Sequence, residues 1–261
     1  MDFVWPGTSP KAGQFFMIKP KRSAVFLGRP ISVALWEPAS KDRDFIRRRA
    51  RSKKNPFQRY LTGKFLESNT VKFLIARRGT GTRELEAMRL GEEAELIGPL
   101  GNAWADFLPK CGGKPIALIG GGIGIAPLEA LLCELPNYNF HFYAGFRKGF
   151  KMDEKAALLG PAFLEAEKVI TATEFGNEGR IGLITDFLEP EQYAAVCVCG
   201  PEPMLKAVAD KCKNTAVPCF VSLERRMACG VGACLGCTVQ TSGGNRRCCA
   251  DGPIFNADEL Y

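Results

Sequence analysis

The residues best suited to do chemistry are cysteines near the C-terminus, within residues 224–249, which read ERRMACGVGACLGCTVQTSGGNRRCC. Cys229, Cys234 and Cys237 follow a C-x4-C-x2-C spacing, and a fourth thiol follows at Cys248 or Cys249. This spacing is typical of loops in which four thiolates bind the two irons of a [2Fe-2S] cluster. Glycines between the cysteines allow such a loop to fold tightly around an inorganic core. The motif therefore predicts a cluster and one-electron chemistry.

Two other uses of these cysteines have to be weighed. A structural zinc site usually shows two short Cys pairs, which fits this spacing less well. Disulfides need an oxidising compartment, and residues 1–14 have neither the basic nor the apolar region of a signal peptide. No uncharged run approaches the roughly 18 residues of a membrane span. We therefore expect a cytoplasmic protein without membrane spans, whose 11 cysteines are cluster ligands or reduced thiols.

Composition limits the remaining possibilities. A chain of 261 residues with 46% hydrophobic residues has room for two compact domains and a small appendage. The single histidine, His141, argues against His-based metal sites and Ser-His-Asp triads. Much of the net charge of +7 comes from residues 43–54, within an irregular insertion at about 41–64. We interpret this insertion as a solvated hairpin extension; the alternative is a contact surface for an acidic partner or RNA. Nucleic-acid binding is not expected, because no aromatic residues alternate with the basic ones.

Residues 1–112 are predicted to form an antiparallel β-barrel. Their apolar runs at 15–18, 31–36 and 71–76 are short, rich in aromatic or β-branched residues, and separated by Pro, Gly and charged residues. Several such strands at short intervals are typical of a barrel.

Residues 113–216 show a different periodicity, in which strands alternate with helical segments. Strands are expected at 115–119, 140–144, 169–172 and 195–199, and helical segments at 128–135, 154–159 and 184–188. This alternation predicts a doubly wound parallel sheet, which binds its ligand at the carboxyl ends of the strands. Glycine-containing turns at 120–127 and 199–204 occupy two such ends, where helix amides can bind a dinucleotide pyrophosphate.

Residues 217–261 form the third predicted domain, which carries the cluster. The segment is too short for an independent core, so we expect the cluster and contacts with the second domain to stabilise it.

Together these motifs resemble the ferredoxin reductase superfamily. The stretch Arg29, Pro30, Ile31 and Ser32 resembles its R-P-x-S flavin motif, in which the arginine pairs with FAD phosphates. The turn that includes Gly81 and Thr82 is similar to the second FAD phosphate turn. The resemblance also implies FAD contacts just before this turn, from Ile75, Ala76 and Arg77. It leaves open whether Ala76 or Arg77 takes the place of the family's arginine.

The nicotinamide site also follows from the resemblance. The residues implied to contact NAD(H) are Gly121, Gly122, Gly124 and Pro127 in one turn, and Cys199, Gly200 and Pro201 in the other. Glu174 is a candidate for binding a ribose hydroxyl, whereas Arg147 and Lys148 could bind a 2′-phosphate, so NADH and NADPH both remain possible.

Within the superfamily, the domain order and cluster loop resemble the electron-transfer subunits of class 1B dihydroorotate dehydrogenases. Cys249-Ala250-Asp251-Gly252-Pro253 matches the turn after that family's fourth ligand, which favours Cys249 over Cys248. The implied cluster ligands are Cys229, Cys234, Cys237 and Cys249. The basic insertion and a short N-terminus depart from the family pattern.

The resemblance implies three cofactors, FAD, a [2Fe-2S] cluster and NAD(H), and no catalytic side chain. It implies an FMN-containing dihydroorotate dehydrogenase catalytic subunit as partner, in a heterotetramer with two copies of each chain. The expected function is electron transfer between that subunit and NAD+ in pyrimidine biosynthesis. The alternative is an NAD(P)H-dependent reductase subunit that serves a ferredoxin, a sulfide dehydrogenase or a hydrogenase.

Overall fold

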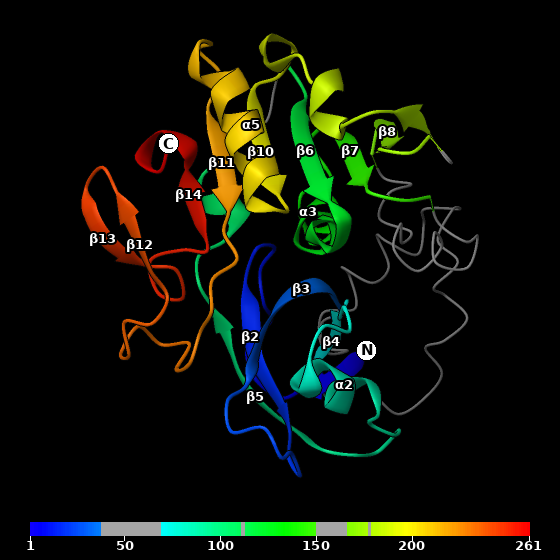
Figure 1. Cartoon of the computed structure of the whole chain (residues 1–261), viewed down its shortest axis with the longest axis vertical. Coiled ribbons are helices and arrows are strands. Elements are labelled where there is room, and N and C mark those ends of the chain that lie inside the picture. Colours follow the sequence, from blue (N-terminus) through cyan, green and yellow to red (C-terminus); the bar gives the residue numbers. More distant parts are fainter. Residues whose placement is uncertain (38–68, 111–112, 150–165, 177–178) are drawn as a thin grey trace.

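The computed structural model describes residues 1–37, 69–110, 113–149, 166–176 and 179–261. These residues form two large sheets, one above the other in Figure 1, and a two-stranded sheet in the C-terminal segment, which runs along one side of both. The basic insertion at about 41–64 and the helix expected at 154–159 lie outside the described residues.

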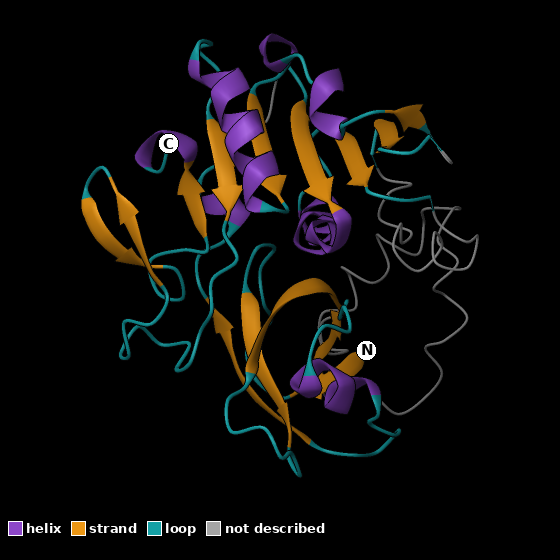
Figure 2. Ribbon diagram, in the orientation of Figure 1, coloured by secondary structure: helices purple, strands orange, loops and turns teal. Residues whose placement is uncertain are grey.

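The N-terminal sheet has five antiparallel strands in the order β1-β4-β3-β2-β5. They are β1 (Asp2–Trp5), β2 (Phe15–Pro20), β3 (Arg29–Glu37), β4 (Asn69–Phe73) and β5 (Ala94–Leu100). Side chains such as Phe16, Val33 and Phe73 point to one face and form its core. The antiparallel arrangement is confirmed, and the sheet curls as a barrel would (Figure 2). Among the described residues, however, β1 and β5 remain separate edges, so the barrel is half open.

The second sheet has seven strands in the order β14-β11-β10-β6-β7-β8-β9. They are β6 (Ile116–Gly121), β7 (Phe140–Phe146), β8 (Lys168–Thr173), β9 (Arg180–Ile181), β10 (Ala195–Cys199), β11 (Cys219–Ser222) and β14 (Ile254–Asn256). All neighbouring pairs are parallel except β11 and β14. The chain enters at β6, builds outward to β9, and then returns to β10 on the other side of β6. The order therefore reverses between β6 and β10, where such sheets bind ligands.

The helices in the described residues are α2 (Thr80–Glu86), α3 (Ala126–Glu134) and α5 (Glu202–Lys213). Short 3-10 turns are η3 (Trp104–Asp106), η4 (Gly122–Ile125), η6 (Ile184–Phe187), η7 (Pro190–Gln192) and η8 (Ala257–Glu259). The helix α2 packs on the N-terminal sheet, and α3 and α5 cover the two faces of the parallel sheet. The helix α3 packs against β3 and lies between the two sheets, whereas α5 covers the opposite face (Figure 2). The helical segment expected at 184–188 is the 3-10 turn η6. No helix in the described part of the chain has the length and apolar character that crossing a bilayer requires.

The C-terminal segment begins inside the parallel sheet. We expected the third domain to start at residue 217, but all four side chains of β11 are buried, as in the interior of a sheet. The strand β14 then pairs with β11 and closes this edge. Between them lie the cluster loop and a hairpin of β12 (Thr238–Thr241) and β13 (Gly244–Arg247). We propose that the cluster domain is an insertion between β11 and β14.

Asn102, just after β5, connects this segment to the N-terminal sheet. Its amide nitrogen donates to the carbonyl oxygens of Asp251 (3.2 Å) and Ile254 (2.9 Å), and its amide oxygen accepts from the Ile254 amide (3.0 Å). The Asn102 backbone amide also donates to the carbonyl of Gly252 (2.7 Å). One side chain thus binds the chain immediately after the predicted fourth ligand.

Asn102→Ala should loosen the C-terminal segment without unfolding either sheet. The substitution removes three partly buried hydrogen bonds, so we expect local opening to become easier by about 1–3 kcal/mol. Hydrogen exchange at the amide of Ile254 measures this change. Asn245→Ala is the matched control, because Asn245 is exposed in the β12-β13 hairpin. Equal exchange in the two variants would contradict the role given to Asn102.

Candidate functional site

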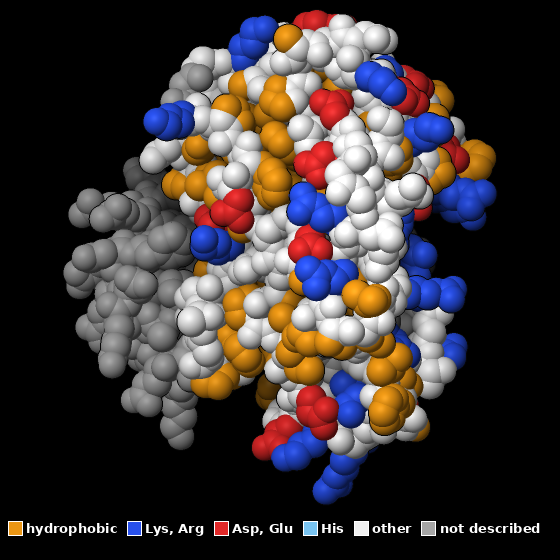
Figure 3. Space-filling model, turned by 90° about the vertical axis from the view of Figure 1, so that its left-hand side faces the viewer, with side chains coloured by type: hydrophobic (Ala, Val, Ile, Leu, Met, Phe, Trp, Pro, Cys, Tyr) orange, Lys and Arg blue, Asp and Glu red, His pale blue; other side chains and the backbone are white. Residues whose placement is uncertain are grey.

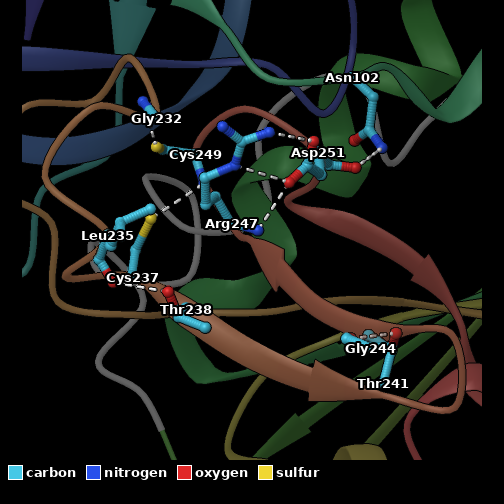
Figure 4. A network of polar contacts seen from close by, with 10 residues as sticks. All are labelled: Asn102, Gly232, Leu235, Cys237, Thr238, Thr241, Gly244, Arg247, Cys249 and Asp251. Carbon is cyan, nitrogen blue, oxygen red and sulfur yellow. Dashed lines mark hydrogen bonds and ion pairs between the residues drawn. The ribbon is translucent and has the colours of Figure 1, made fainter.

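The cluster loop turns its backbone amides toward sulfur atoms. The amide of Gly232 donates to Cys249 Sγ (3.1 Å), that of Cys234 to Cys229 Sγ (3.4 Å) and that of Cys249 to Cys237 Sγ (3.4 Å). Figure 4 shows the first and third of these bonds. Gly230 and Gly232 have left-handed φ values of +74° and +79°, which glycine adopts without strain. Such amides stabilise thiolates, because they place positive dipoles beside the negative sulfurs.

The four predicted ligands lie in two pairs. The thiols of Cys229 and Cys234 contact each other, and so do those of Cys237 and Cys249. No three His, Cys, Asp or Glu side chains in the described ranges converge as the ligands of one metal ion would. A [2Fe-2S] cluster contains two irons and needs four thiolates, so two neighbouring pairs fit it better than they fit a single zinc ion.

Cys248 and Cys249 point in different directions. The Cys248 thiol donates to the carbonyl of Leu223 (3.4 Å), on the side of the parallel sheet. Cys249 Sγ instead accepts from Gly232 and lies against Cys237. The Cys229 thiol is already suited to iron, because the amide of Cys234 and neighbouring amides lower its pKa to about 6. The geometry therefore favours Cys249 as the fourth ligand.

Contacts on both sides hold the cluster loop in place. A Cβ atom added at Gly230 would lie 2.7 Å from Met17 of β2 and 3.0 Å from Leu100 of β5, so the loop packs directly on the N-terminal sheet. Arg247 and Asp251 lie on either side of Cys249 and form a two-armed ion pair, with distances of 3.1 and 3.2 Å (Figure 4). The neighbouring arginine also lowers the pKa of the Asp251 carboxyl.

The predicted FAD phosphate site comes together from two elements. The Arg29 guanidinium lies over the first turn of α2, where a Cβ atom added at Gly81 would come within 2.7 Å of Arg29 Nε. Arg29 Nη1 donates to the carbonyl of Leu27 (2.9 Å), which orients the side chain. The Thr82 hydroxyl accepts from the amides of Arg78 (2.9 Å) and Gly79 (3.1 Å) and shapes the turn.

The other predicted flavin residues line the approach to this turn. Pro30, Ile31 and Ser32 are half-buried on β3, while Ile75 and Ala76 are half-buried after β4. Arg77 is exposed and forms an ion pair with Glu86 of α2 (3.4 Å). The structure therefore brings together Arg29, Gly81 and Thr82. Arg77 lies on the surface beside them, where its ion pair with Glu86 holds it.

The two predicted nicotinamide turns contact each other at the point where the strand order reverses. A Cβ atom at Gly124 would clash with the carbonyl oxygen of Cys199, and one at Gly121 would meet Pro201 at 2.9 Å. Gly200 packs on Gly121 in the same way, because a Cβ atom added at Gly200 would lie 3.1 Å from the Cα atom of Gly121. Only glycine allows these backbones to approach so closely.

Other predicted residues complete this edge of the sheet. The Gly122 backbone is left-handed (φ +56°) with nothing within 4 Å of a Cβ position, so it faces open space. Pro127 lies in the first turn of α3. At the other turn, burial raises the pKa of the Cys199 thiol to about 12. Glu174 follows β8 directly, and Arg147 and Lys148 follow β7, so the ribose candidate and the two 2′-phosphate candidates lie at the same edge.

Sequence reasoning missed two residues that position the cluster loop, Asn102 and Arg247, and it named Asp251 only as part of the turn after the fourth ligand. The charges at 247 and 251 flank Cys249 four positions apart, which was a usable signal. Asn102 offered none, because its partners lie about 150 residues away.

Replacing the two adjacent cysteines should separate their roles. Cys249→Ser removes a thiolate from the Cys237 pair and should abolish the normal electron paramagnetic resonance signal of the reduced cluster. Cys248→Ser should leave that signal and the iron content unchanged, because the thiol bonds only to a backbone carbonyl. Loss of the signal in the Cys248 variant alone would reverse the assignment.

Gly81→Ala should weaken FAD binding while preserving the fold. The added methyl group meets only the far end of the Arg29 side chain, which can move away but then leaves the proposed phosphate position. We expect a roughly tenfold or greater loss of FAD affinity, because a charge-assisted pair is lost. Fluorescence titration of the apoprotein with FAD measures this. Gly79→Ala is the control, since nothing lies within 4 Å of that Cβ position.

Comparison with structures of known proteins agrees with this architecture. A chain described as an NADH-dependent reduced ferredoxin-NADP oxidoreductase superposes with a TM-score of 0.68 at 23% identity, covering 100% of this chain and 84% of that one. The FAD/NAD-binding domain of nitric oxide dioxygenase from Vibrio cholerae gives a TM-score of 0.55 at 15% identity, covering 83% and 87% of the two chains. These similarities show that the fold is that of the ferredoxin reductases.

Sequence comparison is more specific. Residues 224–261 match the model of the iron-sulfur cluster binding domain of dihydroorotate dehydrogenase B. The electron transfer subunit of dihydroorotate dehydrogenase B (NAD(+)) from Clostridium perfringens is 38% identical over 95% of this chain and 86% of the relative. That of Caldanaerobacter subterraneus is 35% identical over 100% of this chain and 91% of the relative. The chain therefore belongs to the family of dihydroorotate dehydrogenase B electron transfer subunits.

Proposed function

We propose that this chain carries electrons from the catalytic subunit of a dihydroorotate dehydrogenase to NAD+. The bound groups supply the chemistry: a [2Fe-2S] cluster exchanges single electrons, and FAD connects one-electron to two-electron transfer with the nicotinamide. The reaction belongs to pyrimidine biosynthesis. The partner is an FMN-containing subunit, in an assembly with two copies of each chain.

The side chains bind and orient these groups and do no acid-base work. Cys229 and Cys234 are proposed to bind one iron, and Cys237 and Cys249 the other. Arg29 and the turn at Gly81 and Thr82 bind the FAD phosphates, with Pro30 to Ser32 and Ile75 to Arg77 beside the flavin. NAD(H) binds where the turns at 121–127 and 199–201 meet. Because the turns and amides are preorganised, little reorganisation is needed on binding.

The observation that carries this proposal is the contact of Gly230 with Met17 and Leu100. It fixes the cluster loop on strands β2 and β5, next to β3 with its flavin motif. Because the cluster site and the flavin site lie on one sheet, electrons can pass directly between the two groups. The reduced thiols that the site needs are best maintained in the cytoplasm, where we place the protein.

The second candidate is a reductase subunit for a different partner, such as a ferredoxin, a sulfide dehydrogenase or a hydrogenase. It would use the same three cofactors and differ only in its docking surface. Family membership favours the dihydroorotate partner. Copurification of this chain with a dihydroorotate dehydrogenase catalytic subunit separates the two candidates.

An anaerobic visible spectrum of the purified chain, with iron and sulfide analysis, tests the proposal directly. We expect flavin bands and a broad iron-sulfur absorbance, with about two irons and two sulfides per chain. Addition of NADH should bleach both, because the two groups exchange electrons. A colourless protein, or one that contains zinc, would contradict the proposed function.

A further inference from the structure

The backbone of Leu235 has a conformation that is unfavourable for leucine. Among the described residues it is the one non-glycine residue with a positive φ, +57°. A side chain with a Cβ atom makes this left-handed conformation costly, whereas glycine adopts it freely. The side chain gains little from burial in return, because the residue is 62% exposed. Within this chain alone, glycine would serve better at position 235.

The turn itself is set by the cluster loop. Leu235 lies between the ligands Cys234 and Cys237, and its carbonyl oxygen accepts two hydrogen bonds from Thr238, one from the amide (3.2 Å) and one from the hydroxyl (2.6 Å). Figure 4 shows Leu235 and Thr238 beside the buried Cys237. The left-handed turn is therefore enforced whatever side chain stands there, and the leucine side chain requires a separate explanation. Strained residues that the surrounding structure holds in place are concentrated at functional sites.

The surroundings of Leu235 are apolar and open. Residues 229–237 include no charged residue, and Val231 on the same loop is 58% exposed. The ligand Cys234 is exposed between them. Figure 3 views the molecule from the side of the C-terminal segment, and this face carries several apolar areas separated by charged side chains. The predicted cluster thus reaches the surface under two exposed aliphatic side chains.

We infer that Leu235, together with Val231, is a docking contact that inserts into an apolar pocket of the electron-donating catalytic subunit. The inference rests on the proposed function, because electrons enter the cluster from that subunit. Docking would bury both side chains, and the free energy gained from this burial would offset the cost of the strained turn. It would also exclude water beside Cys234. A few fully desolvated residues near the centre of an interface account for most of the affinity of many complexes.

Two substitutions at Leu235 test this inference in the cofactor-loaded chain. Leu235→Gly removes the side chain and relieves the turn, and Leu235→Asn keeps a residue that tolerates a left-handed backbone but is polar. We expect both to weaken binding to the cognate catalytic subunit by roughly tenfold or more, measured by calorimetric titration. The visible spectrum and its bleaching by NADH should match those of the unchanged chain, and the thermal midpoint should not fall, because both substitutions ease the left-handed turn. Leu90→Asn is the control, because Leu90 is fully exposed outside the cluster loop.

The possible outcomes separate the inference from the proposed function. If the unchanged chain binds the catalytic subunit and both Leu235 variants bind equally well, the docking role is wrong and the proposed function stands. If the variants lose cluster absorbance, Leu235 has a structural role and the inference is again wrong. If the unchanged chain, with both cofactors present, does not bind the catalytic subunit, the proposed partner and the inference fail together.

Discussion

The structure depends on one constraint: a short loop must hold four thiolates against a flavin-binding sheet. The loop has no core of its own, so other parts of the chain must fix its two ends. Strand β11 precedes it and strand β14 follows it, and the two pair side by side at the edge of the parallel sheet. Asn102 then binds the returning chain to the N-terminal sheet. The position of the cluster is thus set by both large domains together.

This arrangement supports the proposed insertion of the third domain in the second. A segment that joined the sheet only at its start would leave the far side of the loop free, and the distance from Cys249 to the flavin sheet would vary. Returning as β14 fixes both ends of the loop. The hydrophobic core continues accordingly from α5 through Val239 and Cys248 to Met17 of β2. Electron transfer between two groups benefits from such a fixed spacing, since no large motion is needed between steps.

The three sites share a reliance on backbone geometry. Backbone amides lie beside the sulfurs, a helix start lies under Arg29, and two glycine turns touch where the sheet order reverses. Charged side chains are few and are mostly held in pairs, as with Arg247 and Asp251. Fixed backbone dipoles are suited to anionic groups such as thiolates and phosphates, because they are oriented before the ligand arrives. Leu235 departs from this pattern, because its backbone is left-handed without being glycine and its side chain is 62% exposed.

The sequence by itself determined the chemistry. Ligand spacing, glycine turns and strand periodicity are local patterns, and they were enough to predict the cluster, the flavin motif, the parallel sheet and the family. The turn at residues 249–253 already favoured Cys249 over Cys248 by resemblance, and the tertiary structure adds the physical reason, because the two adjacent thiols face opposite sides once the chain is placed between two domains. Only the tertiary structure decided the role of Asn102, whose partners are distant in sequence, and the place of β11 inside the sheet. Long-range packing decided these features, and no local pattern encodes it.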